Sequence, residues 1–174
     1  MKKNSFFRNT KLRIDYVICI LVLVLFSGCY SFTGGSVPEH LKTLYIATIN
    51  DNSGYGDPRY REQLTQLIID KFRNDNSLKI VDRNGDARLS IVISSIKDET
   101  LVVRPGEVET ERKISVTCDV DYFDAVKKKE IFKKPMTNSI VYPLANAVTE
   151  RNKAISKAFE QLSDDILLAV VSGW

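Results

Sequence analysis

The residue with the clearest chemistry in this sequence is Cys29, whose thiol directly follows two small residues, Ser27 and Gly28. An eleven-residue apolar run, Tyr16–Phe26, precedes the small residues, and five basic residues against one acid precede that run. This order of basic, apolar and small residues is typical of a cleaved secretory signal. Eleven residues are too few to span a bilayer, since a membrane-crossing helix needs roughly 20 apolar residues. The sequence therefore predicts that residues 1–28 are removed and that the mature chain begins at Cys29.

The residues around Cys29 resemble a bacterial lipobox, in which the thiol is acylated before cleavage. This resemblance implies a diacylglycerol on the Cys29 sulfur and an acyl chain such as palmitate on the new amine. Stable anchoring takes more than one chain, at about 0.8 kcal/mol per buried methylene, so we expect an anchored rather than a membrane-spanning protein. Phe26 occupies the place where a lipobox usually has leucine. The alternative is an ordinary secretory signal with an incidental cysteine.

Composition excludes several classes of protein. Removal of residues 1–28 leaves 146 of the 174 residues with a net charge near −1, so no global positive field indicates nucleic-acid binding. Cys118 is the only cysteine left for the domain, which excludes an internal disulfide, and we expect it to be a small core residue. His40 is the only histidine, and no CxxC or HExxH motif is present. We therefore expect no metal and no cofactor. An envelope hydrolase that uses His40 as its base is a poor alternative, because this histidine lies in the expected tether.

The chain beyond Cys29 divides into a tether and one domain. Residues 29–40 are rich in Gly, Ser and Pro and predict a flexible lipidated tether that includes His40, whereas residues 41–174 predict a single domain. Periodicity and turn residues predict strands over 41–49, 78–81 and 130–141, a long hairpin over 87–122, and helices over 58–73 and 144–171. Pro135 marks the strand over 130–141 as an edge strand. This order favours an α+β two-layer sandwich, with a mixed four- to five-stranded sheet and two helices on one face.

The hairpin carries the most specific structural predictions. A two-residue turn at Pro105 and Gly106 places Ile93 opposite Cys118. The same register predicts two charge pairs across the hairpin, Glu99 with Arg112 and Asp98 with Lys113. Pro-Gly favours a turn whose twist suits hairpins poorly, so a bulge is the alternative.

The predicted hairpin is longer than the first helix that supports it. Arms of about 16 residues reach roughly 50 Å, whereas a helix over 58–73 is only about 24 Å long. The distal half therefore needs other cover, and charged residues with a few valines dominate it. Such an amphiphilic finger offers apolar surface to acyl chains and Arg104 to a phosphate. The alternative is an ordinary solvated hairpin end.

The mature sequence resembles the LptE family of outer-membrane lipoproteins along almost its whole length. The segments that carry the resemblance are Cys29 with residues 30–34, residues 36–39, residues 41–43, the helix over 58–73, residues 78–81, residues 86–89 and the final helix that ends at Trp174. The resemblance implies a non-enzymatic plug in the lumen of the LptD β-barrel, which helps that barrel to assemble and assists insertion of lipopolysaccharide into the outer leaflet. Together with Tyr30 in place of an acidic retention residue, it implies the outer membrane. The alternative is a pilotin or accessory subunit of another envelope complex.

The resemblance also implies lipopolysaccharide contacts. Arg104 matches a basic residue at the hairpin tip that the family uses for this contact. A second basic position of the family falls near Asn146 and Ala147, which are neutral here, and Arg151 and Lys153 are only its neighbours. A further candidate is Lys127–Lys129, which could contact anionic headgroups or lipopolysaccharide phosphates. Lysines beside an edge strand also guard against aggregation, and the sequence does not separate these alternatives.

Overall fold

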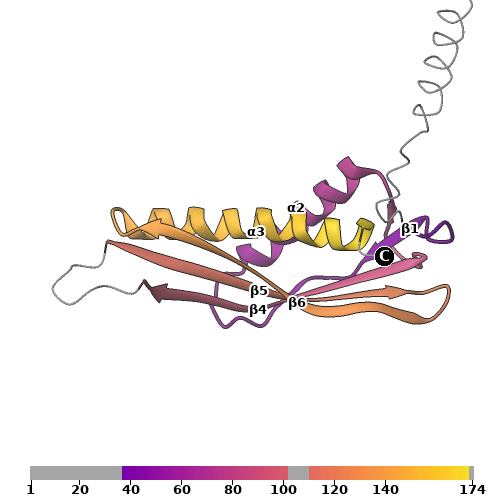
Figure 1. Ribbon diagram of the computed structural model, residues 1–174, viewed down its shortest axis with the longest axis horizontal. Coiled ribbons are helices and arrows are strands. Elements are labelled where there is room, and N and C mark those ends of the chain that lie inside the picture. Colours follow the sequence, from indigo (N-terminus) through magenta and orange to yellow (C-terminus); the bar gives the residue numbers. More distant parts are fainter. Residues whose placement is uncertain (1–36, 102–109, 173–174) are drawn as a thin grey trace, which may run out of the picture. The chain divides into compact units, whose positions relative to one another are not determined.

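The computed structural model describes residues 37–101 and 110–172. They form a mixed sheet with both helices on one of its faces (Figure 1). The elements in chain order are β1 (Thr43–Ile46), β2 (Asn50–Asp51), α2 (Arg59–Asp75), β3 (Lys79–Val81), β4 (Ala87–Thr100), β5 (Glu111–Asp124), β6 (Lys129–Pro143) and α3 (Ala147–Ser172). The strand order is β3-β1-β4-β5-β6, with β2 also paired to β4. The predicted α+β two-layer fold is confirmed.

The first strand is shorter than predicted, and this changes the strand count. The expected strand over 41–49 ends at Ile46, after which the chain stays beside β4 through a hydrogen bond from the Ala47 N–H to the Leu89 carbonyl at 2.9 Å. It pairs with β4 again at Asn50 and Asp51, which were expected in a loop. The sheet therefore has six strands rather than four or five.

The first helix, α2, begins and ends at residues whose types favour helix ends. Asp57 accepts a hydrogen bond from the Arg59 backbone N–H at 3.0 Å, as expected for a carboxylate before the first turn. Asn76 closes the helix in the left-handed conformation, with φ 58° and its N–H bonded to the Phe72 carbonyl. The buried side chains of α2 recur every four residues and face the sheet: Tyr60, Leu64, Ile68 and Phe72.

The hairpin register is confirmed near the core and wrong beyond it. Ile93 lies opposite Cys118 as predicted, but a bulge follows at once, and Ser95 pairs with Thr117. The extra residue in β4 moves every later partner by one position. Both predicted charge pairs are therefore wrong. Glu99 lies opposite Lys113 (Oε2 to Nζ, 3.4 Å), whereas Asp98 lies opposite Ile114 and contacts Arg112 diagonally (Oδ1 to Nε, 2.9 Å). The predicted turn at Pro105 and Gly106 lies outside the described residues.

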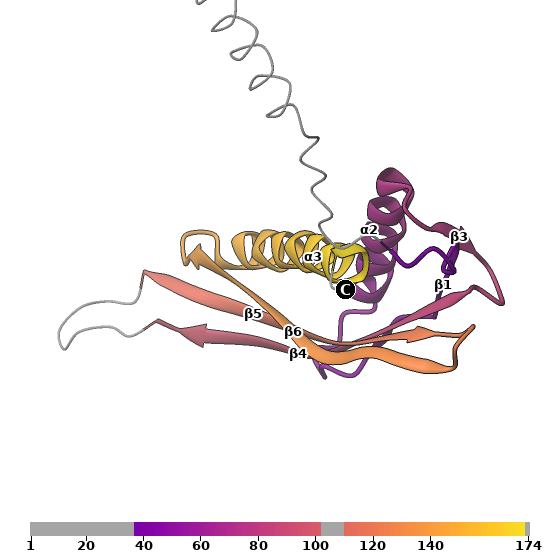
Figure 2. The ribbon, with the colours of Figure 1, turned by 45° about the vertical axis from the view of Figure 1, so that its right-hand side comes forward.

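The distal half of the hairpin is covered by α3 rather than exposed as a finger. This helix has 26 residues, so it extends about 39 Å and lies along β5 and β6 beyond the reach of α2 (Figures 1 and 2). Ile96, Ile114 and Val116 are buried beneath it. The expectation of an unsupported finger is therefore wrong for the described part of the hairpin. The prediction that β6 is an edge strand is confirmed, because β6 stands last in the strand order of the described residues.

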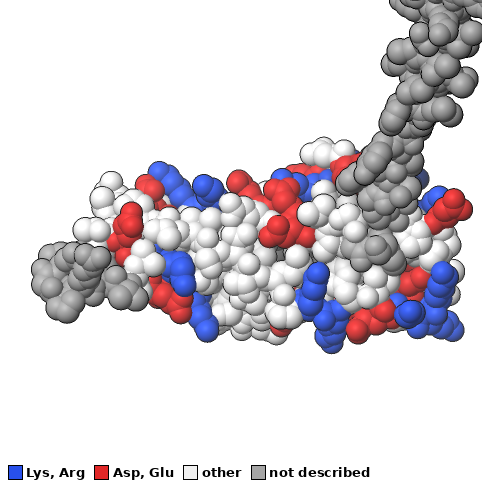
Figure 3. Space-filling view, viewed as in Figure 1, with Lys and Arg blue, Asp and Glu red and all other residues white. Residues whose placement is uncertain are grey.

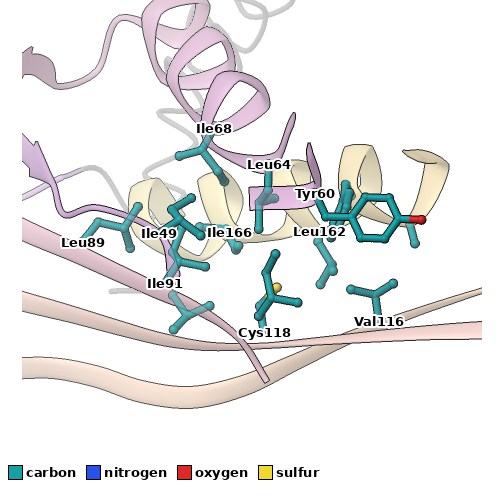
Figure 4. Close-up of a cluster of buried hydrophobic side chains, with 14 of the residues drawn as sticks. Ile49, Tyr60, Leu64, Ile68, Leu89, Ile91, Val116, Cys118, Leu162 and Ile166 are labelled. Carbon is teal, nitrogen blue, oxygen red and sulfur yellow. The ribbon is translucent and has the colours of Figure 1, made fainter. Parts of the chain in front are cut away.

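The core lies between the two helices and the sheet (Figure 4). Cys118 is fully buried among the apolar side chains of this core, as predicted. Burial, aided by the negative charges of Asp119 and Asp51, raises the pKa of its thiol to about 12. Cys118 is therefore a packed, unreactive core residue.

Candidate functional site

The candidate site residues fall at opposite ends of the sheet. Cys29 and Arg104 lie outside the described residues. The chain enters the segment with Arg104 from the end of β4 and leaves it into the start of β5, whereas Lys127–Lys129 follow the other end of β5. Fourteen residues of β5 separate these ends, a distance of about 46 Å. We call the end of β4 and start of β5 the distal end of the sheet, and the other end of β5 the proximal end.

The distal end is held together by a network around Asp98. The Tyr142 hydroxyl donates to this carboxylate, with 2.8 Å to each oxygen, and the Arg112 guanidinium pairs with it. Burial, together with the hydrogen bond and charge of Asp98, raises the pKa of Tyr142 to about 12. The Leu144 N–H donates to the Thr110 carbonyl at 2.9 Å, which ties the residue after β6 to the residue before β5. The hairpin arms and the end of β6 are thus fixed to each other.

A half-buried basic residue of α3 adds to this end. Arg151 is one turn into α3, its Nε is buried, and this atom has no hydrogen-bond partner among the described residues. Its positive charge acts on both Tyr60 and Tyr142, opposing the rise that burial causes in the pKa of each. The structure therefore places a cation of α3 beside the hairpin arms, close to the neutral positions Asn146 and Ala147.

At the proximal end all three candidate lysines are exposed, Lys127 and Lys128 on the turn between β5 and β6 and Lys129 at the first residue of β6. Lys127 donates its backbone N–H to the Asp124 carboxylate at 2.8 Å, and Lys128 has a φ of 53° in the left-handed region. The backbone is therefore fixed by Asp124, which leaves the three ammonium groups directed into solvent.

The same carboxylate binds a residue that the sequence analysis missed. His40 was expected in the tether, but its Nε2 lies 2.6 Å from Asp124 Oδ2. Asp124 continues the inward-facing alternation of Val120 and Tyr122 and is only 4% exposed. An aspartate at an inward position needs a partner, and this signal was present in the sequence. The ordered domain therefore begins before Leu41.

The pairing of His40 with Asp124 stabilises the charged carboxylate. Burial alone would raise the pKa of Asp124, but the hydrogen bonds from Lys127 and His40 and the charge of His40 outweigh it and lower this pKa below its usual value. A carboxylate with a lowered folded pKa stabilises the fold above its unfolded pKa. That contribution is lost as the pH falls through the folded value.

Replacement of His40 should therefore have a pH-dependent cost. We expect His40→Ala to lower the free energy of unfolding at pH 7 by about 1–2 kcal/mol, because a buried carboxylate loses a hydrogen bond. The difference from the parent should shrink as Asp124 becomes protonated below pH 3.8. Thermal unfolding between pH 3 and pH 7 measures this, with Glu39→Ala as the exposed neighbouring control. Equal stability of His40→Ala and the parent at pH 7 would contradict the role given to this pair.

The contact between His40 and Asp124 is of the kind that orients the base in a nucleophilic triad. Within residues 37–101 and 110–172, no hydrogen bond joins His40 to a hydroxyl or thiol. In the same ranges no group of His, Cys, Asp or Glu side chains could hold a metal ion. Neither of the described helices has a stretch long and apolar enough to cross a membrane.

Solved structures of low sequence identity share this fold. A hypothetical protein from Chlamydia trachomatis matches with a TM-score of 0.58 and 11% identity, over 75% of this chain and 95% of that one. The uncharacterized lipoprotein B from Nitrosomonas europaea matches with a TM-score of 0.55 and 14% identity, over 76% and 84%. A minor lipoprotein from Acinetobacter baumannii matches with a TM-score of 0.52 and 11% identity, over 75% and 92%. At these identities the likeness concerns the fold alone.

The family assignment comes from sequence. No curated protein sequence matches this chain. The family model LptE, described as lipopolysaccharide-assembly, matches residues 41–170. This match runs from the residues before β1 to the last turn of α3, and therefore includes the hairpin, the edge strand and the helix that covers them. The chain accordingly belongs to the LptE family of lipopolysaccharide-assembly proteins.

Proposed function

We propose that this protein is an outer-membrane lipoprotein, anchored through Cys29, that plugs an LptD-like β-barrel, helps it to assemble and assists the insertion of lipopolysaccharide into the outer leaflet. The observation that carries the proposal is the family match over residues 41–170. The lipobox-like sequence at Cys29 supports the anchor. The role is one of binding and assembly, with no catalytic step.

The described distal end supports a lipopolysaccharide contact there. The segment with Arg104 joins two arms that α3 covers, so its ends are fixed in space by the Asp98 network. Arg151 places a second cation near this end. Lys127–Lys129 would form a separate phosphate contact at the proximal end, and a guard for the edge of β6 is their alternative role.

Affinity purification of the tagged chain from outer membranes tests the partnership. We expect an LptD-like barrel to co-purify in stoichiometric amount. Absence of such a barrel contradicts the proposal, and recovery of a different envelope complex favours a pilotin or accessory subunit. A Cys29→Ala variant separates the anchor from the partner: it should leave the domain folded, and any outer-membrane localisation that persists must come from the barrel.

A charge reversal at Arg104 tests the lipopolysaccharide contact. We expect Arg104→Glu to weaken lipopolysaccharide binding by at least tenfold, because a charge-assisted pair with phosphate becomes a repulsion. The melting temperature should stay within about 1 °C of the parent, as expected for a surface substitution. Arg73→Glu, an exposed position in the last turn of α2, is the matched control. Equal binding by Arg104→Glu and Arg73→Glu would contradict the contact.

A further inference from the structure

A hollow at the proximal end, near the turn that carries Lys127 and Lys128, contains two arginines for which no contact has been proposed above. Its volume is about 340 Å³, and its lining residues are Tyr45, Arg83, Asn84, Gly85, Arg88 and Ala125. Arg88 stands between Tyr45 and Phe123 in the register of β1, β4 and β5. Its guanidinium lies 5.1 Å from the centre of the Phe123 ring, and this cation–π contact holds it in place. We call this hollow the arginine cleft.

The turn between β3 and β4 shapes the arginine cleft. Gly85 lets this turn lie against β1, because a Cβ there would come within 2.5 Å of the Tyr45 backbone nitrogen. Asn84 takes the left-handed conformation with φ 52°. Asp86 then fixes the turn to β1, since its carboxylate accepts the N–H groups of Lys42 and Thr43 at 2.9 Å each. The cleft therefore has a rigid wall on the side of Arg83.

The two guanidinium groups of the arginine cleft are not neutralised. Within the described residues, neither Arg83 nor Arg88 has a carboxylate oxygen within 4.0 Å. The nearby carboxylate of Asp86 is occupied by donors from β1, which lower its pKa through hydrogen bonds from the Lys42 backbone and the Thr43 side chain. Asp124 is occupied by His40 and Lys127. The cleft is thus a positive site with hydrogen-bond donors still available.

The surroundings of the arginine cleft indicate which kind of anion it binds. Ala125 lines the cleft, and the next residue, Val126, is an apolar side chain that is 55% exposed. Three lysines follow it on the same turn. Val37, where the described chain begins, is only eight residues from Cys29, so a lipid anchor there is within about 30 Å of the domain. In Figure 3 charged side chains lie at the right of the view, along its upper edge and near the left of the described part, while the lower middle is mostly uncharged.

We propose that the arginine cleft binds the phosphate of an anionic phospholipid headgroup in the leaflet that holds the anchor. Arg83 and Arg88 donate to the phosphate oxygens, as planar guanidinium forks do. Val126 then enters the interface beside the bound headgroup, with the lysines around it at the headgroup level. The inference rests on the lipid anchor of the proposed function, but it requires neither a barrel nor lipopolysaccharide.

Titration of the full-length chain, purified in a non-ionic detergent, with glycerophosphoglycerol tests the site by calorimetry. This water-soluble headgroup does not partition into micelles. We expect saturable binding that Arg83→Gln and Arg88→Gln each weaken at least fivefold and that the double variant abolishes. Arg73→Gln removes the same charge from an exposed position in the last turn of α2 and should leave the affinity unchanged.

Two further ligands identify the source of the phosphate. Glycerophosphocholine should bind more weakly, because its own cation competes with the arginines. Inorganic phosphate that binds as tightly as glycerophosphoglycerol would overturn the headgroup assignment. Absence of binding, or an equal loss in Arg73→Gln, would overturn the site itself. Because barrel and lipopolysaccharide are absent from this titration, its failure is distinguishable from failure of the proposed partnership.

Discussion

Phe159→Ala should lower the free energy of unfolding by about 3–5 kcal/mol, the range for an aromatic ring removed from a core. Phe159 is fully buried in α3, and its ring meets that of Tyr60 edge to face, with centroids 5.7 Å apart. The substitution therefore leaves a cavity at the contact between the two helices. Because α3 also covers the distal half of the hairpin, we expect the whole domain to be destabilised rather than one helix.

Urea denaturation followed by circular dichroism measures the free energy of unfolding. Thermal unfolding should also show a fall of about 10 °C in the melting temperature, at roughly 2–4 °C per kcal/mol for a chain of this size. Leu168→Ala is the control on the same helix, since Leu168 is 60% exposed and its loss should cost under about 0.5 kcal/mol. A loss below about 1 kcal/mol in Phe159→Ala would contradict the packing of α3 against α2.

Asp98→Ala should lower the free energy of unfolding by about 2–3 kcal/mol. Its carboxylate is the acceptor for the Tyr142 hydroxyl and the partner of Arg112, and its side chain is only 18% exposed. Loss of one partner in a partly buried, charge-assisted network costs more than the net value of the pair, because the remaining groups keep their desolvation cost. The substitution should also loosen the distal end, since Asp98 joins β4 to β5 and β6.

Glu99→Ala is the matched control for Asp98→Ala, with the same charge change one residue along β4. Its pair with Lys113 is longer, at 3.4 Å, and the two side chains are 49% and 39% exposed. An exposed pair contributes about 0–1 kcal/mol. Both variants are measured by urea denaturation in the same buffer. Equal losses in the free energy of unfolding would show that the Asp98 network stabilises the fold no more than the exposed pair does.

The sequence by itself determined the elements and their order, except for the short strand β2. Alternation of apolar residues in β4 and β5, three-and-four spacing in α2 and α3, and Pro135 in β6 are local signals with a direct physical meaning, and they predicted the α+β sandwich and the edge strand. They also placed Cys118 in the core, because its position in the alternation is inward. The identity of the family was recognisable from segments spread along the chain, and the family match over residues 41–170 agrees with it.

Only the tertiary structure decided which residues meet across the chain. The bulge after Ile93 moved Glu99 opposite Lys113 and Asp98 opposite Ile114, because one extra residue in a strand shifts all later pairs. The energy of the bulge depends on the packing of both layers. The hydrogen bond between His40 and Asp124 joins residues that are 84 positions apart, so it depends on long-range packing. The arginine cleft does too. Local periodicity determines the face on which a side chain lies, but the register and the crossing of elements determine its partner, and these follow from the summed packing of the whole domain.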